Sequence, residues 1–145
     1  MKKIKRPSAE KVIARQIREY LSMRGLPNEK IDSGAVFVKK GPAMFKLNLA
    51  ERGTPDLLTC VRGRMVWIEV KESPEEIAEW ERQWQKHLET KTVKASWERS
   101  IYQHTIQAKW RDAGAEIIVC SSVEECAEDI EQLIREYDAA ARPTT

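Results

Sequence analysis

Four stretches of the chain carry apolar residues three and four positions apart, the spacing of one face of an α-helix. The first helix is expected to begin after Ser8, a typical N-cap residue, and to end at Gly25. Ser73-Pro74-Glu75-Glu76 predicts the start of the second, because it combines an N-cap, a proline at the first helical position and a capping box. The other two helices are expected over residues 97–113 and after Ser122.

Shorter apolar segments between these helices predict five β-strands. They cover residues 35–38, 44–47, 56–61, 65–71 and 116–120. Leu26-Pro27-Asn28 is expected to be a loop. The resulting order, α-β-β-β-β-α-α-β-α, predicts a single mixed α/β domain over residues 8–138, with a basic tail before it (1–7) and a frayed tail after it (139–145).

The composition is that of a globular protein, with 41% apolar and 33% charged residues among 145. No apolar run approaches the ~18 residues that a membrane span needs. A signal peptide is not expected, because Pro-Ser-Ala-Glu follows the basic N-terminus where an apolar stretch would be required. Cys60, Cys120 and Cys126 are odd in number and lack CxxC spacing, which predicts reduced core thiols in a cytoplasmic protein.

The net charge of +2 conceals a strong polarity along the chain. Residues 1–24 hold eight Lys or Arg and two Glu, a balance of +6, whereas residues 116–138 hold one Arg and eight acids, a balance of −7. The first helix is therefore basic and the last acidic, which leaves one face suited to an anionic partner such as DNA.

The segment from Asp56 to Lys71 carries the candidate chemistry. Arg62-Gly63 predicts a two-residue turn, which would set Asp56 opposite Glu69. The two carboxylates would then lie about 5 Å apart and repel by about 3 kcal/mol at an effective dielectric constant near 20. Either Lys71, two residues along the same face, or a divalent metal is expected to offset that repulsion.

A metal held by two carboxylates suits phosphodiester hydrolysis. It lowers the pKa of a bound water and neutralises the charge that builds on the phosphorus oxygens. An ammonium such as Lys71 can orient the water or stabilise the same charge. The competing interpretation is a solvent-facing hairpin with incidental charges, since alternating charge is common on exposed strands.

These residues resemble a known family motif. Arg52-Gly-Thr-Pro-Asp-Leu-Leu58, followed by Ile68-Glu-Val-Lys71, is similar to the signature of PD-(D/E)XK nucleases and more narrowly of their VRR-NUC branch. Ser8-Ala-Glu-Lys11 resembles the glutamate-bearing start of that branch's first helix, and Ser100-Ile-Tyr-Gln103 resembles its Ser-x-x-Gln. The likeness covers roughly residues 8–125, in the family's order of motifs.

The resemblance implies a restriction-endonuclease-like α/β fold, a mixed sheet flanked by helices, and Mg²⁺- or Mn²⁺-dependent cleavage of DNA. Asp56, Glu69 and Lys71 would be catalytic, with the Val70 carbonyl as a further metal ligand. The resemblance also implies a preference for branched DNA, as in Holliday-junction resolvases, and a homodimer. The cytoplasm of a bacterium or of a phage-infected cell is the expected setting.

Two further residues join the expected site mainly through the resemblance. Glu10 lies on the core-facing side of the first helix, where it is either a metal ligand and catalytic residue or a first-turn acid that favours the helix dipole. Gln103 is either a catalytic residue that orients water or phosphate or an ordinary surface amide. The resemblance favours the site for both.

Basic residues around the first helix are the expected DNA contacts. Lys11, Arg15 and Arg18 share one helix face, which is either a phosphate-binding stripe or a solvated surface. The other predicted DNA-binding residues are Lys5, Arg6, Lys39, Lys40, Lys46 and Arg52.

Residues 72–99 depart from compact members of the family, because a whole helix with Trp80 and Trp84 replaces a short loop. The insert is expected to be a lid, a dimer arm or a DNA-wedging element, with its tryptophans in a packing stripe. Two alternatives to a junction resolvase remain: a flap or replication-fork nuclease of the same fold, and a DNA-binding subunit without catalysis. The facing Asp56 and Glu69 favour an enzyme.

Overall fold

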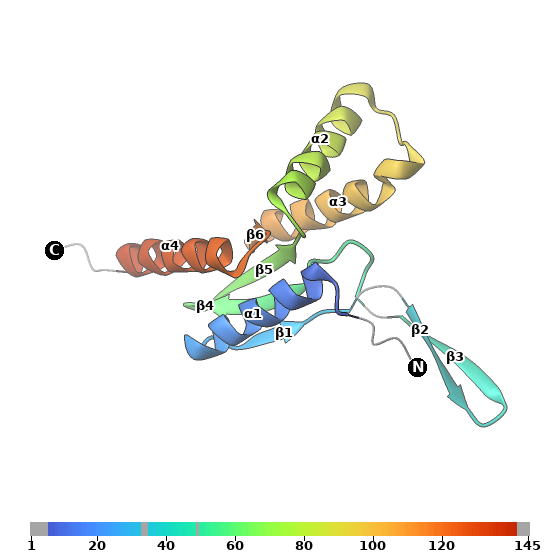
Figure 1. The fold of residues 1–145 in the computed structure, drawn as a ribbon, viewed down its shortest axis with the longest axis horizontal. Coiled ribbons are helices and arrows are strands. Elements are labelled where there is room, and N and C mark those ends of the chain that lie inside the picture. The colour runs from blue at the N-terminus through green and yellow to red at the C-terminus, as the bar shows by residue number, and fades with distance from the viewer. Residues whose placement is uncertain (1–5, 33–34, 49, 142–145) are drawn as a thin grey trace.

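The protein is built around one four-stranded sheet (Figure 1). The computed structural model describes residues 6–32, 35–48 and 50–141, with residues 35–38 and 45–48 described by their backbone alone. The strands of the sheet lie in the order β1 (Asn28–Lys30), β4 (Leu57–Val61), β5 (Arg64–Val70) and β6 (Glu116–Cys120). β6 runs parallel to β5, and the other neighbours are antiparallel, so the sheet is mixed as expected.

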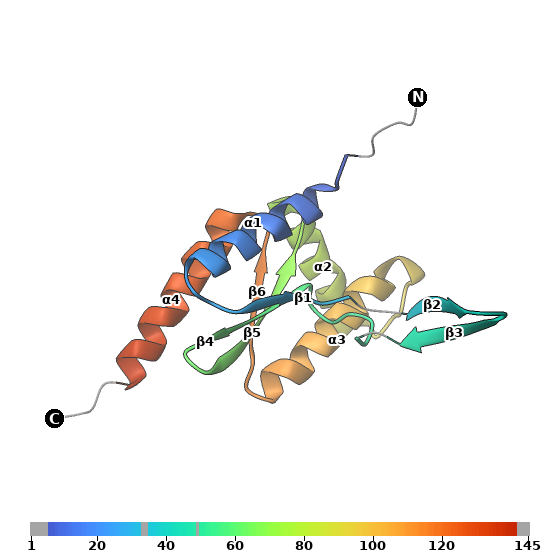
Figure 2. The same cartoon turned by 90° about the horizontal axis from the view of Figure 1, so that it is seen from below.

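Helices cover both faces of this sheet (Figure 2). α1 (Ala9–Met23) and α4 (Val123–Ala141) lie on one side, and α3 (Glu98–Asp112) lies on the other. The core beneath α1 and α4 is aliphatic, with no exposed surface at Ile17, Leu57, Ile68 and Ile130. The chain therefore has an α/β architecture of a mixed sheet flanked by helices. Among the described helices, none is long and apolar enough to cross a membrane.

α2 (Pro74–Thr90) is the helix that the sequence inserts after β5. It packs along α3, and a short 3₁₀ turn (Ala95–Trp97) joins the two. Together α2 and α3 form an arm that extends from the sheet (Figure 1). The expected third helix at residues 97–113 is therefore this short turn followed by α3.

Helix caps lie where the sequence predicts them. The Ser8 hydroxyl accepts a hydrogen bond from the Lys11 amide at 3.4 Å, and the Ser73 hydroxyl accepts one from the Glu76 amide at 3.1 Å. The Glu76 carboxylate reaches back one residue further than in a standard capping box and accepts from the Glu72 amide at 2.8 Å. Both helices thus begin where a serine satisfies an otherwise unpaired backbone N–H.

The turn between β4 and β5 is a tight two-residue turn. Arg62 and Gly63 both have positive φ, 51° and 79°, as a type I′ turn requires. The turn sets Leu58 opposite Trp67, so the register predicted from the sequence is confirmed.

The segment expected to be a loop at Leu26–Asn28 leads directly into β1. This strand pairs with β4 through Asn28 and Thr59, Glu29 and Leu58, and Lys30 and Leu57. Three residues are too few to show the alternation by which a strand is recognised in sequence, so β1 escaped prediction.

The strands expected at residues 35–38 and 44–47 form β2 (Ala35–Lys40) and β3 (Ala43–Asn48). They pair only with each other, in a two-stranded sheet separate from the main one. The hairpin extends away from the body of the protein (Figure 1). It is a second projection, beside the arm of α2 and α3.

Two expectations about chain ends and thiols are corrected. α4 continues through Ala141, so residues 139–141 are helical rather than part of a frayed tail, and residues 142–145 lie outside the described chain. Cys60 is exposed, whereas Cys120 and Cys126 are buried as expected. The strand alternation explains the difference, because the buried positions of β4 are the odd-numbered ones.

The basic first helix and the acidic last helix pack against each other. Glu131 of α4 accepts hydrogen bonds from the Tyr20 hydroxyl and from Arg24 Nε of α1, each at 2.7 Å. Burial and the adjacent carboxylate raise the pKa of Tyr20 to about 12. These contacts neutralise charge at the C-terminal end of α1, while Lys11 and Arg15 nearer its start stay exposed.

Ile17→Ala tests how α1 is held to the sheet. Ile17 has no exposed surface, so the substitution should lower the free energy of unfolding by about 2–5 kcal/mol. Urea denaturation followed by tryptophan fluorescence measures this change. The neighbouring Gln16 is exposed, and Gln16→Ala should stay within about 0.5 kcal/mol of wild type. Equal losses in the two variants would show that the buried face of α1 does not anchor it.

Candidate active site

Successive side chains of β5 point to opposite faces of the sheet. Ile68 and Val70 join the aliphatic core, whereas Glu69 and Lys71, which follows the strand, contact α3 on the opposite side. Both charged side chains are almost fully buried, with 1% and 2% of the residue surface exposed. Burial on this scale is costly for a charge unless it is paired and hydrogen-bonded.

Gln103 of α3 joins the two buried side chains, Glu69 and Lys71. Its side-chain oxygen accepts hydrogen bonds from the Lys71 ammonium at 2.8 Å and from the Trp80 indole N–H at 2.7 Å. Its amide nitrogen donates to Glu69 Oε1 at 3.1 Å, and Lys71 Nζ lies 3.5 Å from the same oxygen. Side chains from β5, α2 and α3 therefore form one buried network. The inserted helix α2 contributes Trp80 to this network. The spacing of Trp80 in the sequence predicted only a place in a packing stripe.

The rest of the arm packs behind this network. The Ser100 hydroxyl donates to the Gln83 side-chain oxygen at 2.6 Å and so ties α3 to α2. The His104 ring stacks on Trp80, with ring centres 3.6 Å apart, and on Trp84 at 4.9 Å. Burial lowers the pKa of His104 to about 4, so its ring is neutral near pH 7. The tryptophans of α2 thus pack on a buried histidine of α3, a partner that the predicted packing stripe did not identify.

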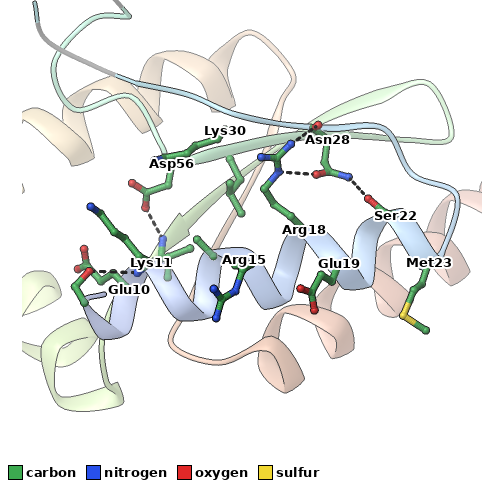
Figure 3. A pocket seen from close by; sticks show the side chains of 14 residues that line it. Glu10, Lys11, Arg15, Arg18, Glu19, Ser22, Met23, Asn28, Lys30 and Asp56 are labelled. Atoms are coloured by element: carbon green, nitrogen blue, oxygen red, sulfur yellow. Dashed lines mark hydrogen bonds between the residues drawn. The ribbon is translucent and has the colours of Figure 1, made fainter. Parts of the chain in front are cut away.

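Asp56 ends the loop that precedes β4. Continuing the β4–β5 pairing one residue beyond its last pair sets Asp56 opposite Glu69, as predicted. Asp56 Oδ2 accepts a hydrogen bond from the Val70 amide at 2.8 Å (Figure 3). Burial raises the pKa of the Asp56 carboxyl, and this hydrogen bond and the Lys71 charge oppose the increase.

The Glu69 carboxyl is incompletely satisfied. Its buried Oε2 has no hydrogen-bond partner in the described part of the chain. Burial first, and the Asp56 carboxylate second, raise the pKa of Glu69 to about 8, although Lys71 lowers it. A hard divalent cation would supply the missing partner and offset the repulsion between the carboxylates. Asp56 and Glu69 therefore fit a Mg²⁺ or Mn²⁺ site, and the part expected of the Val70 carbonyl stays a prediction.

Glu10 lies near this pair without completing a cluster of ligands. Among residues 6–32, 35–48 and 50–141, no group of three or more His, Cys, Asp or Glu is arranged to hold a metal ion. Burial, followed by the charges of Glu76 and Asp56, raises the pKa of Glu10, and Arg99 and Lys71 act in the opposite direction. Glu10 is thus within electrostatic reach of Asp56, and its role as a ligand stays a prediction.

A groove of about 850 Å³ runs along α1 from this end of the sheet (Figure 3). It lies between α1 and the strands β1 and β4, with Glu10 and Asp56 at one end and Met23 at the other. Its cationic lining residues are Lys11, Arg15, Arg18 and Lys30. The structure therefore brings the predicted basic face of α1 to the same groove as Glu10 and Asp56.

The cations of this groove are held to different degrees. Arg18 Nε donates to the Asn28 side-chain oxygen at 2.9 Å, which fixes its guanidinium against β1 (Figure 3). Lys11 and Arg15 are exposed, and neither makes an ion pair within the described residues. These two side chains are available to an anionic ligand.

Arg52 lies on the other side of Asp56 from α1. Its guanidinium pairs with Glu98 at 3.0 Å and lies 4.8 Å from the centre of the Tyr102 ring. It lines a separate, smaller cavity next to Asp56. The structure thus keeps Arg52 near the candidate site but outside the groove along α1.

Among the remaining predicted DNA contacts that the structure describes, none lines the groove. Lys39 and Lys40 are exposed near the tip of the β2–β3 hairpin, which extends away from the sheet (Figure 1). Arg6 is exposed just before α1. Lys5 and the side chain of Lys46 lie outside the described residues.

Sequence reasoning missed two residues that shape the site on the α3 side. Gly53 has a φ of +93°, and a Cβ there would lie 2.7 Å from the carbonyl carbon and oxygen of Tyr102. The loop before Asp56 therefore packs directly on the α3 backbone, which only glycine allows. The charge of Arg99, in the first turn of α3, lowers the pKa values of Asp56 and Glu69. The Gly-Thr-Pro segment before Asp56 is a sequence signal that could have identified Gly53. No feature of the sequence identifies Arg99.

Comparison of the chain with models of protein families, with curated proteins and with solved structures finds no match.

Glu69→Gln should change how stability depends on pH. Because the pKa of Glu69 is higher in the folded state than its ordinary value of 4.5, its stabilising contribution is complete below pH 4.5 and is lost as pH rises toward 8. Wild type should therefore lose stability between pH 5 and 8 in chelator, and Glu69→Gln should lose less. Urea denaturation at several pH values measures both. The exposed Glu81→Gln should follow wild type, and parallel curves for wild type and Glu69→Gln would contradict the raised pKa.

Proposed function

We propose that this protein is a divalent-metal-dependent DNA endonuclease with a restriction-endonuclease-like fold. The observation that carries the proposal is the set of Asp56, Glu69 and Lys71, in which Asp56 also lines the groove that carries the cations of α1. A protein that only bound DNA would gain nothing from a buried carboxylate whose second oxygen lacks a partner. This argument favours hydrolysis over binding alone.

Asp56 and Glu69 would hold the Mg²⁺ or Mn²⁺ ion, with Glu10 and the Val70 carbonyl as further candidate ligands. When bound, the ion supplies Lewis-acid stabilisation of the phosphate and lowers the pKa of a water. The hydrogen bond from the Val70 amide restrains the Asp56 carboxylate before any ion binds. Such restraint reduces the reorganisation needed when the site fills.

Lys71 would supply positive charge at the reacting phosphate. Gln103 holds its ammonium at 2.8 Å, and the Trp80 ring centre lies 5.1 Å from Nζ. An ammonium fixed in this way can stabilise negative charge on the phosphorus oxygens or orient the attacking water with little rearrangement. Gln103 would then be a positioning residue, because it orients Lys71 and Glu69 and does not act on the phosphate itself.

The groove along α1 is the proposed path of a DNA strand. Lys11 and Arg15 are exposed on its rim and suit contacts to phosphates, which fix the register of a strand without reading its sequence. The arm of α2 and α3 and the β2–β3 hairpin both extend from the body (Figure 1), which supports a branched substrate with more than one duplex arm. The resemblance of the motifs around Asp56 and Glu69 to those of VRR-NUC nucleases is the further basis for proposing branched DNA as substrate and a homodimer as the assembly.

Cleavage of labelled four-way junctions, flaps and linear duplexes tests the proposed reaction directly. Wild type should cut branched DNA with Mg²⁺ and not in chelator. Asp56→Asn, Glu69→Gln and Lys71→Met should each lower the rate at least about 100-fold, because the first two variants lose a proposed metal ligand and the third loses the ammonium proposed to stabilise the reacting phosphate. Glu81→Gln on the exposed side of α2 is the control and should cut like wild type.

The same panel of substrates separates the alternatives. Cleavage of flaps but not of junctions would identify a flap or fork nuclease of the same fold. Tight binding to all three without metal-dependent cleavage of any would identify a binding subunit and refute the proposed reaction.

The salt dependence of DNA binding tests the groove. In chelator, Lys11→Gln combined with Arg15→Gln should weaken binding and reduce the slope of log K against log salt by about 1.8, because two phosphate contacts are lost. Fluorescence anisotropy over a range of salt concentrations measures the slope. The control combines Lys109→Gln with Arg111→Gln, two exposed cations near the end of α3. If the salt slope fell equally in both double variants, the DNA strand would not bind in the groove along α1.

A further inference from the structure

A second cavity lies next to Asp56, on its α3 side. It measures about 280 Å³ and is bounded by the loop before Asp56 and by the first turns of α3. Its walls include Arg52, Thr54, Arg99 and Tyr102. Asp56 is also part of the wall of the groove along α1, so the two spaces meet at the candidate catalytic carboxylate.

Two guanidinium groups in this cavity differ in how they are held. Arg52 is restrained by its ion pair with Glu98 at 3.0 Å and by the Tyr102 ring at 4.8 Å. Arg99 makes no hydrogen bond or ion pair with any described residue. Its charge nevertheless lowers the pKa values of three acids, Glu10, Asp56 and Glu69. Arg99 is therefore an uncommitted cation beside the candidate site.

The shape of the cavity is set by backbone contacts. At Gly53, any side chain would meet the carbonyl group of Tyr102 at 2.7 Å, so the loop and α3 are in direct contact. Within the loop, the Thr54 hydroxyl and amide both donate to the Glu51 carbonyl, at 2.6 Å and 3.0 Å. These contacts restrain the wall that carries Arg52.

The volume of the cavity and the charges of its lining residues indicate which ligand it can bind. Its volume falls just below the range of about 300–1,000 Å³ that holds a drug-sized molecule, which suits a small group such as a phosphate. Guanidinium groups bind phosphate through paired, charge-assisted hydrogen bonds. Of the charged lining residues, Arg52 pairs with Glu98 from outside the cavity, and Arg99 is the cation left to bind a phosphate beside Asp56.

We propose that this cavity is a phosphate-binding pocket, in which Arg99 and Arg52 hold a backbone phosphate of the DNA strand beside the one being cut. The assignment rests on the proposed function and adds to it the binding site for the neighbouring phosphodiester. A strand that follows the groove along α1 passes Asp56 and places its next phosphate in the pocket. Arg99 then acts as a binding residue that fixes the strand across the reacting position.

Inorganic phosphate is the first probe, used without metal. Titration of isotope-labelled protein should shift the side-chain amide signals of Gln103, which lines the pocket, in a saturable way. The shift should be lost in Arg99→Gln and kept in Arg111→Gln, an exposed arginine at the far end of α3. An unchanged Gln103 shift in Arg99→Gln would overturn the pocket. Thermal melting of the variants confirms that each is folded.

DNA is the second probe, in chelator and then with Mg²⁺. Arg99→Gln should weaken binding of a four-way junction about tenfold, reduce the salt slope by about 0.9, and raise KM more than it lowers kcat. Arg52→Gln should act in the same direction. Cleavage with unchanged KM and salt slope in Arg99→Gln would overturn the pocket and leave the proposed function standing. A phosphate shift that depends on Arg99, in a wild-type protein that neither binds nor cuts DNA, would instead refute the proposed function and the assignment of a DNA strand.

Discussion

The buried carboxylate of Glu69 is the constraint on which the rest of the site depends. With 1% of its residue surface exposed, it needs partners, and it finds them only where three elements meet. Lys71 comes from the end of β5, and Gln103 comes from α3. Trp80 of α2 fixes Gln103 in turn, so the inserted helix is part of the support of the site. Even so, Oε2 has no partner among the residues that the structure describes, and this is the physical argument for a bound cation.

Tight local geometry brings the second carboxylate to the first. The type I′ turn at Arg62 and Gly63 determines which residue of β4 faces which residue of β5. At the other end of β4, Gly53 lets the loop pack on the backbone of α3. Asp56 follows this loop and is held by the Val70 amide. The positions of both ends of the five-residue strand β4 are thus fixed, which leaves Asp56 and Glu69 little freedom to move apart.

Much of this arrangement could be predicted from the sequence, because it depends on local signals. The caps at Ser8 and Ser73 and the turn at Arg62 have short-range signatures, and the turn alone gives the pairing of Asp56 with Glu69. The parts that could not be predicted depend on distant contacts. Arg99 is one exposed arginine among many until α3 is packed beside the loop, and β1 is a strand only because β4 lies next to it. Trp80 has the spacing of a packing residue, and only the fold shows its indole N–H on Gln103.

Proton release on metal binding would show whether Asp56 and Glu69 form a cation site in which the pKa of Glu69 is raised. Titration calorimetry with Mg²⁺ or Mn²⁺ in buffers of different ionisation enthalpy counts the protons released. With the pKa of Glu69 near 8, binding at pH 7 should release close to one proton, and the number should fall toward zero by pH 9. Glu69→Gln should remove the release. Absence of metal binding, or binding with no proton released at pH 7, would mean that Asp56 and Glu69 do not form such a site.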